Sequence, residues 1–147
     1  MLEGNSIEFV ETKGLPGYRY LHVPSLEAVF GGSMLFSGLH VWTADASTTA
    51  QRAAWIAELD ALAERNPQIV VPGHMASNAS CDASAIAFTR DYLLAFEEEC
   101  AKASGSEALI GAMSRRYPDA EMRVALAIGA KVAKGEMNWT KRFSVRD

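Results

Sequence analysis

The sequence holds 147 residues, of which 49% are hydrophobic and 22% charged, and this composition fits one globular domain rather than a disordered chain. The net charge is −4 and positive charge clusters only at Lys141, Arg142 and Arg146, which argues against nucleic acid as a partner. No apolar run approaches the roughly 20 residues that cross a bilayer, and residues 1–4 lack a secretion signal, so we expect a cytoplasmic protein.

The first 23 residues predict a β-hairpin. Residues 7–11 form a short β-prone run, residues 13–17 are dense in turn formers, and residues 18–23 supply a second strand. His22 falls inside that second strand, where alternation places it on the same face as Tyr20. We expect a packing or surface role for His22 rather than a catalytic one.

Residues 28–36 predict a strand, a glycine turn and another strand. Gly31 and Gly32 allow a positive φ or a close backbone approach. Such a pair suits a plain β-turn, a hairpin, or a loop at the edge of a metal site, and the residues themselves leave these alternatives open.

Residues 39–45 hold the most site-like group of side chains before residue 69. Trp42 suits a pocket wall, His40 suits a base or a ligand, and Asp45 suits a partner for a histidine. The alternative is that Trp42 is a core residue, His40 is a surface or strand-end residue, and Asp45 or Ser47 caps the helix that follows. Residues 48–51 also have capping-box spacing, Thr-x-x-Gln, for that helix.

A helix followed by a buried strand is predicted for residues 49–74. The helix covers 49–65 and shows one apolar face that would pack on a sheet, formed by Trp55, Leu59, Leu62 and Ala63. Asn66-Pro67 ends it, and 69–71 is an apolar run with the length of a buried strand. His74 then stands near the carboxyl end of that strand, where α/β folds place their chemistry.

Three more helices are predicted in the rest of the chain. They cover residues 83–102, with Ser80 or Asp82 as the N-cap, then 107–117 and 119–134, with Asp119 as a cap. In the first of them the side chains of residues 97–99, all glutamates, form a solvated face.

The two cysteines, Cys81 and Cys100, are separated by most of the predicted 83–102 helix. Because a helix rises 1.5 Å per residue, they lie too far apart to bridge and are expected to be free thiols. Cys100 suits a small core position. Cys81 lies in a loop near His74, where it is either an ordinary thiol or a reactive or ligating one.

The order of these elements, ending in Pro72-Gly73-His74, resembles the C-terminal half of metallo-β-lactamase-fold hydrolases over roughly residues 5–100. In that family the first half carries an HxHxDH loop, and a strand ending in Gly-Asp lies where Gly32-Ser33 lies here. The resemblance implies an α/β fold: half of an αββα sandwich in residues 1–103, with a small mixed sheet covered by helices. Residues 104–147 would be a helical extension packed on the same domain or on a partner chain.

The resemblance also implies a site. His74 matches the last metal ligand of the family, while His40 and Asp45 are candidate catalytic residues near it. Ser33 replaces the expected acidic ligand, and a neutral hydroxyl is a poor ligand for zinc. Since the chain has only three histidines, we expect no metal in the isolated chain, and zinc or iron only if the full site is assembled.

A lone half of the sandwich would expose one apolar sheet face, for which we expect Val29, Leu35 and Val70. A missing N-terminal half or a second copy would cover that face, and we expect a homodimer by sheet-to-sheet contact. Two functions remain open. The chain is a truncated or degenerate relative of these hydrolases, or a fragment of an active one; alternatively it is a non-catalytic dimeric module that binds a small molecule or a protein.

Overall fold

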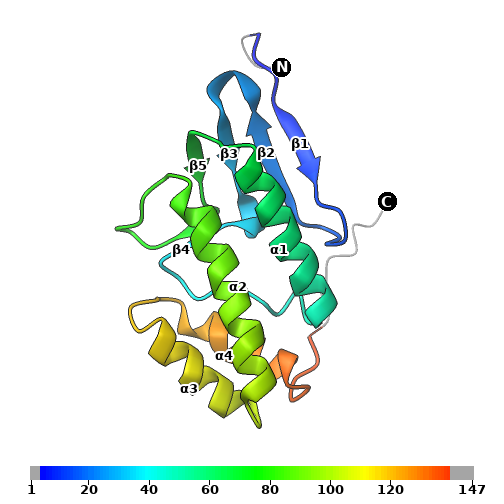
Figure 1. Cartoon of the computed structure of the whole chain (residues 1–147), viewed down its shortest axis with the longest axis vertical. Coiled ribbons are helices and arrows are strands. Elements are labelled where there is room, and N and C mark those ends of the chain that lie inside the picture. Colours follow the sequence, from blue (N-terminus) through cyan, green and yellow to red (C-terminus); the bar gives the residue numbers. More distant parts are fainter. Residues whose placement is uncertain (1–3, 140–147) are drawn as a thin grey trace.

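The computed structural model describes residues 4–139 and has the expected α/β character, with a small mixed sheet and four α-helices in that part of the chain (Figure 1). The strands are β1 (Glu8–Glu11), β2 (Arg19–Val23), β3 (Ala28–Phe30), β4 (Phe36–Ser37), β5 (Ile69–Val71) and β6 (His74–Met75). The helices are α1 (Thr49–Glu64), α2 (Ser84–Lys102), α3 (Ser106–Arg116) and α4 (Arg123–Ala133), with 3₁₀ turns at Pro24–Leu26 and Gly32–Met34. Lys141, Arg142 and Arg146 lie outside the described residues.

The main sheet has the strand order β1-β2-β3-β5. β1, β2 and β3 are antiparallel neighbours, which confirms the predicted hairpin, and β5 runs parallel to β3. The parallel pair is joined through α1, the crossover helix that such a connection requires. Within residues 4–139 no helix has the length and apolar character needed to cross a bilayer.

The predicted strand, turn and strand of residues 28–36 exist, but they do not form a hairpin. β3 belongs to the main sheet, whereas β4 pairs in parallel with β6 in a separate two-stranded sheet. The chain changes sheet at Gly32, whose φ is +50°, and Gly73 passes directly against it. A Cβ at Gly73 would lie 1.8 Å from the carbonyl oxygen of Gly32, so these two segments approach more closely than any side chain allows.

The inner face of the sheet packs against α1, and α2 lies beside α1 with its first turns next to β5 (Figure 1). Val29 and Val70 point to this face and are fully buried with Trp55 and Leu59 of α1. Leu35 is fully buried as well. The expectation that Val29, Leu35 and Val70 form an exposed face is therefore wrong, because the chain's own helices and loops cover them.

The outer face carries the side chains that alternate with these along each strand. One cross-strand row holds Phe9, Leu21, Phe30 and Val71, and a second holds Val23, Ala28 and Ile69. Val23 and Ala28 are buried, but Phe9 is 78% exposed, Phe30 39% and Ile69 44%. An apolar outer face therefore does exist, built from different residues than the sequence pattern indicated.

Helix α1 begins with a capping box. The Thr48 hydroxyl accepts the Gln51 backbone N–H at 3.2 Å, and the Gln51 side chain returns to the Thr48 backbone N–H. Asp45 is therefore not the cap. The predicted apolar face is confirmed for Trp55, Leu59 and Leu62, whereas Ala63 is exposed.

Helix α2 follows its predicted limits closely, and the Asp82 carboxylate accepts the Ser84 backbone N–H at 2.9 Å near its start. The predicted solvated face of glutamates is correct for Glu98. It is wrong for Glu97 and Glu99, whose side chains are 24% and 15% exposed, because basic residues from α1 and α3 reach them.

The last two helices pack on the rest of the chain: α3 lies against α2 and α4. The final helix begins at Arg123 and not at residue 119, because the backbone of Glu121 pairs with Gly38 and His40 instead of entering a helix. Further along α4, Gly129 lies against Thr43, whose hydroxyl would be 2.2 Å from a Cβ at that position. These contacts fix α4 to residues 38–43.

Candidate functional site

A cavity of about 460 Å³ opens where β4, β6 and the loop before α1 meet. Four side chains that the sequence singled out line it together, namely Ser33, Trp42, Asp45 and His74. The remaining lining residues are Tyr18, Phe36, Met122 and Val124. The walls are thus mostly aromatic and aliphatic, with the polar groups of Tyr18, Ser33, Asp45 and His74 among them.

His74 is the first residue of β6 rather than the end of β5, and its side chain is exposed. Its imidazole stacks on Phe36, with ring centroids 4.7 Å apart and planes within 9° of parallel. The pairing of Phe36 with His74 in the β4–β6 ladder holds the two residues in register. One face of the imidazole is therefore covered by Phe36, while the ring stays open to solvent.

Asp45 and Trp42 contact a residue from the far end of the described chain. The Trp139 indole N–H donates to the Asp45 carboxylate at 2.9 Å, and the Trp139 ring meets the Trp42 ring edge-on at 5.3 Å. Nothing in the sequence pattern indicated which residues Trp139 contacts. The only available signal was an indole placed shortly after the last helix.

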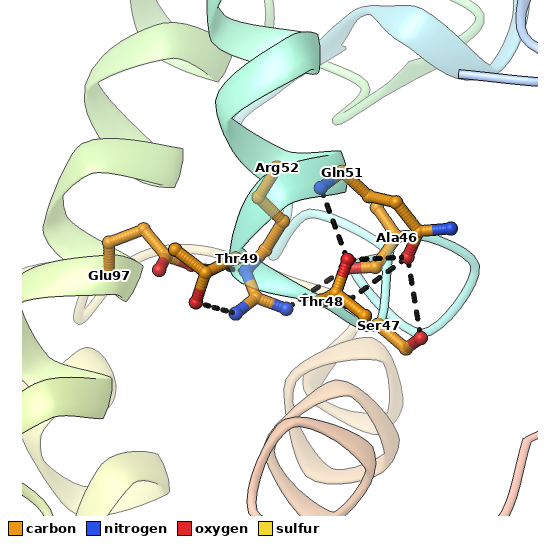
Figure 2. Close-up of polar contacts among 7 residues, drawn as sticks. All are labelled: Ala46, Ser47, Thr48, Thr49, Gln51, Arg52 and Glu97. Atoms are coloured by element: carbon orange, nitrogen blue, oxygen red, sulfur yellow. Dashed lines mark hydrogen bonds and ion pairs between the residues drawn. The ribbon is translucent and has the colours of Figure 1, made fainter. Parts of the chain in front are cut away.

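Arg52 joins the loop before α1 to α2, and Figure 2 shows its side chain between Ala46 and Glu97. Its side chain is 3% exposed, and its guanidinium donates to the Ala46 carbonyl at 2.9 Å and to the Glu97 carboxylate of α2. It also lies over the Phe96 ring at 5.4 Å. Because Ala46 follows Asp45 directly, this network ties the cavity wall to α1 and α2.

Sequence reasoning did not single out Arg52, although a signal for it exists. It lies on the apolar face of α1, three residues before Trp55 and seven before Leu59. A charged residue on an apolar helix face is rarely buried unless it is paired. Its partner, Glu97, was assigned to solvent.

His40 does not line the cavity. It is 1% exposed, and its Nδ1 forms a 2.9 Å hydrogen bond with the buried Tyr92 hydroxyl. Burial, with a smaller contribution from the charge of Arg123, lowers the pKa of His40. Burial also raises the pKa of Tyr92. Both groups are therefore held neutral as a packed polar pair, away from the candidate site.

The other two sequence features lie elsewhere. His22 contacts Glu8 across the hairpin, with Nδ1 and Oε2 3.0 Å apart. Both cysteines are free, as predicted; Cys81 is exposed, with its sulfur 3.9 Å from that of Met75, and Cys100 is half-buried.

The donor set does not fit zinc or iron by itself. Within residues 4–139 no three histidine, cysteine or carboxylate side chains converge into a metal-binding group. Catalytic zinc takes three protein ligands and leaves one position for water. His74 and Asp45 reach the cavity, but Ser33 contributes only a neutral hydroxyl, and Asp45 already accepts from Trp139.

The negative charge of Asp45 acts on Tyr18, another residue of the cavity wall. Burial raises the pKa of Tyr18, and the negative charge of Asp45 raises it further. Tyr18 is 3% exposed and packs on Trp55, with ring centroids 4.9 Å apart. The site thus combines a protonated phenol, a carboxylate, an imidazole and a hydroxyl with apolar walls, a set suited to holding a small molecule.

No protein-family model matches the chain, and no curated protein matches it. A function therefore has to be argued from the structure, and the two features that bear on it are the cavity and the exposed outer face of the sheet.

Proposed function

We propose that this chain is a truncated or degenerate relative of the C-terminal half of metallo-β-lactamase-fold hydrolases, and that on its own it binds a small molecule without hydrolysing it. The observation that carries the proposal is the cavity itself. His74 and Ser33, the two positions matched to the family's ligands, line one largely apolar cavity together with Asp45, and no three histidine, cysteine or carboxylate side chains of the described chain converge there. We also propose a cytoplasmic location, in keeping with two free thiols.

The missing ligands argue against hydrolysis by the isolated chain. A metal-dependent hydrolase uses its ion to lower the pKa of bound water to about 7, which requires a site that holds the ion firmly. One imidazole and one carboxylate that is already hydrogen-bonded do not provide such a site. The candidate catalytic role of His40 also loses support, because its ring is buried against Tyr92.

The cavity has the properties of a ligand site. Its volume of about 460 Å³ lies within the range of roughly 300–1,000 Å³ that is typical of small-molecule pockets. Its walls are pre-formed, since Phe36 stacks on His74 and Arg52 fixes the residue after Asp45. Little free energy would therefore be needed to order the site around a ligand.

The test combines metal analysis with ligand binding on the full chain. After dialysis we expect no stoichiometric metal and no turnover of ester, lactone or β-lactam substrates. Members of a small-molecule fragment library should shift the NMR signals of the His74 ring but not those of His22, which serves as the internal control. Stoichiometric retained zinc or iron, or a library that leaves His74 unmoved, would refute the proposal.

A second proposal concerns the outer sheet face: we propose that it binds a second copy of the chain. Phe9, Phe30 and Ile69 expose 78%, 39% and 44% of their surface there, and burial of apolar surface yields about 25 cal/mol per Å². Flat sheet faces pack on one another about 10 Å apart, and a two-fold axis lets one face serve both copies.

Charge also favours self-association. Glu11 and Arg19 lie on the same outer face and pair with each other at 3.3 Å. This end of the face is therefore neutral, although the whole chain carries a net charge of −4. A face of four short strands is at the small end of specific interfaces, so we expect a weak dimer.

Light scattering over a range of concentrations tests the dimer. The mass should rise toward twice the chain mass, and Phe9→Lys with Phe30→Lys should abolish this rise. Leu94→Lys, which changes an exposed residue on α2, is the matched control. A wild-type chain that stays monomeric would refute self-association. If it instead binds a separately produced N-terminal half and then retains zinc or iron, the chain is a fragment of an active hydrolase.

A further inference from the structure

We propose that the cavity at His74 takes a small organic cation, an ammonium group on an apolar body, with Asp45 as its counter-ion. This inference rests on the proposed binding function and adds the chemical class of the ligand. It follows from three features of the cavity, which are its charge, its aromatic walls and a carboxylate that no cation of the described chain pairs.

The charge of the lining is negative. Asp45 is the carboxylate among the lining residues, and neither lysine nor arginine is among the described side chains that form the wall. Arg123 lies between the lining residues Met122 and Val124 but is itself exposed and does not line the cavity. An anionic ligand would meet Asp45 without a compensating cation in the wall.

Asp45 has no cationic partner in the part of the chain that the structure describes. None of the ion pairs formed within residues 4–139 includes it, and its donor there is the uncharged indole of Trp139. A carboxylate has about four lone-pair positions for hydrogen bonds. A neutral ligand would cover this charge without pairing it, which is unfavourable, whereas an ammonium group would neutralise it.

The walls suit the rest of such a ligand. Tyr18, Phe36 and Trp42 contribute aromatic rings from three separate segments, and Met122 and Val124 add aliphatic surface. The negative faces of aromatic rings attract cations, and the attraction grows when water is excluded. A carboxylate beside several aromatic rings therefore favours an amine or a quaternary ammonium over a neutral or acidic molecule.

A series of six-carbon ligands isolates the charge of the ligand. Hexylammonium, hexanol and hexanoate are titrated into the full chain at neutral pH and low salt, with binding followed by NMR and calorimetry. Hexylammonium is expected to bind at least about tenfold more tightly than hexanol, and hexanoate more weakly than either. Because the preference is electrostatic, it should shrink as salt is raised.

Asp45→Asn is the decisive variant, because the asparagine side chain keeps an oxygen that accepts the Trp139 indole N–H while the charge is lost. It should reduce the affinity for hexylammonium by about tenfold and leave that for hexanol unchanged. Asp119→Asn, which removes an exposed carboxylate outside the cavity, is the matched control and should change neither. Circular dichroism verifies that both variants are folded.

The possible outcomes distinguish a failure of the cation assignment from a failure of the proposed small-molecule binding. Equal affinity for hexylammonium and hexanol, or a preference that survives Asp45→Asn in a folded protein, overturns the assignment of a cation. If none of the three ligands binds while other fragments shift His74, the cation is refuted and the binding function stands. If nothing shifts His74, both are refuted.

Discussion

The two faces of the main sheet have similar apolar character and very different exposure. Val29 and Val70 on the inner face are fully buried beneath α1 and α2, whereas Phe9 and Phe30 on the outer face are 78% and 39% exposed. Val29 and Phe30 are neighbours on one strand. The stability of the single chain therefore depends mainly on the inner face, and the outer face is the surface through which we propose association.

Val29→Asp is expected to have the largest effect on stability. It places a carboxylate without a partner in the core, which should lower the free energy of unfolding by about 3 kcal/mol or more. Phe30→Asp, one residue further along the same strand, should cost only about 1 kcal/mol, mainly through strand propensity. Urea unfolding at low protein concentration measures both, and equal losses would contradict the assignment of the two faces.

Arg52→Met tests the contacts that hold the two helices over the inner face. The change leaves the Glu97 carboxylate and the Ala46 carbonyl without their donor. Breaking a fully buried pair costs about 3–5 kcal/mol, and since Glu97 is 24% exposed we expect about 2 kcal/mol. The control is Arg90→Met, which breaks an exposed pair with Asp60 and should cost about 0.5 kcal/mol or less. A similar loss in both variants would mean that Arg52 has no special role.

Thr48→Ala should have a smaller effect, a loss of about 1 kcal/mol, because it removes the side-chain cap of α1. Hydrogen exchange at the Gln51 amide should become faster. Asp45→Asn should leave that exchange rate unchanged, since Asp45 does not cap the helix. Faster exchange in the Asp45 variant would restore the cap predicted from the sequence.

The last expected effect is a pH dependence from His40, which appears only below about pH 6.5. Burial lowers the pKa of His40 in the folded chain, so below about pH 6.5 the unfolded chain binds the proton more readily. The free energy of unfolding should therefore be constant above this pH and fall as the pH drops below it, by at most about 1.4 kcal/mol per unit. Comparing the pH dependence of urea unfolding for the wild type and His40→Gln isolates this contribution; identical slopes would contradict it.

The elements with local signals were predictable from the sequence. The hairpin has a turn dense in Gly and Pro, α1 has its capping box and Asn66-Pro67, and β5 is a short apolar run between prolines. Each of these signals lies within a few residues of the element that it defines. The candidate site was partly predictable for the same reason, since Trp42, Asp45 and His74 were identified from their local setting.

What the sequence did not indicate depends on contacts between distant residues. Which alternating set of strand side chains is buried depends on the side of the sheet that α1 and α2 cover. The start of α4 depends on the pairing of Glu121 with the Gly38–His40 backbone. His40 and Asp45 lie five residues apart, yet one is buried against Tyr92 and the other faces the cavity. No local pattern separates these two environments.

The hydrogen bond between Asp45 and Trp139 joins residues 94 positions apart. A chain leaves the ribosome from its N-terminus, so the sheet and α1 can begin to pack while the cavity still lacks one side. The entropy cost of closing so long a loop must be met before its contacts stabilise the fold, so these contacts form later than those within a hairpin or a helix. The cavity should therefore be among the last features to form during synthesis, complete only after residues 121–139 have emerged.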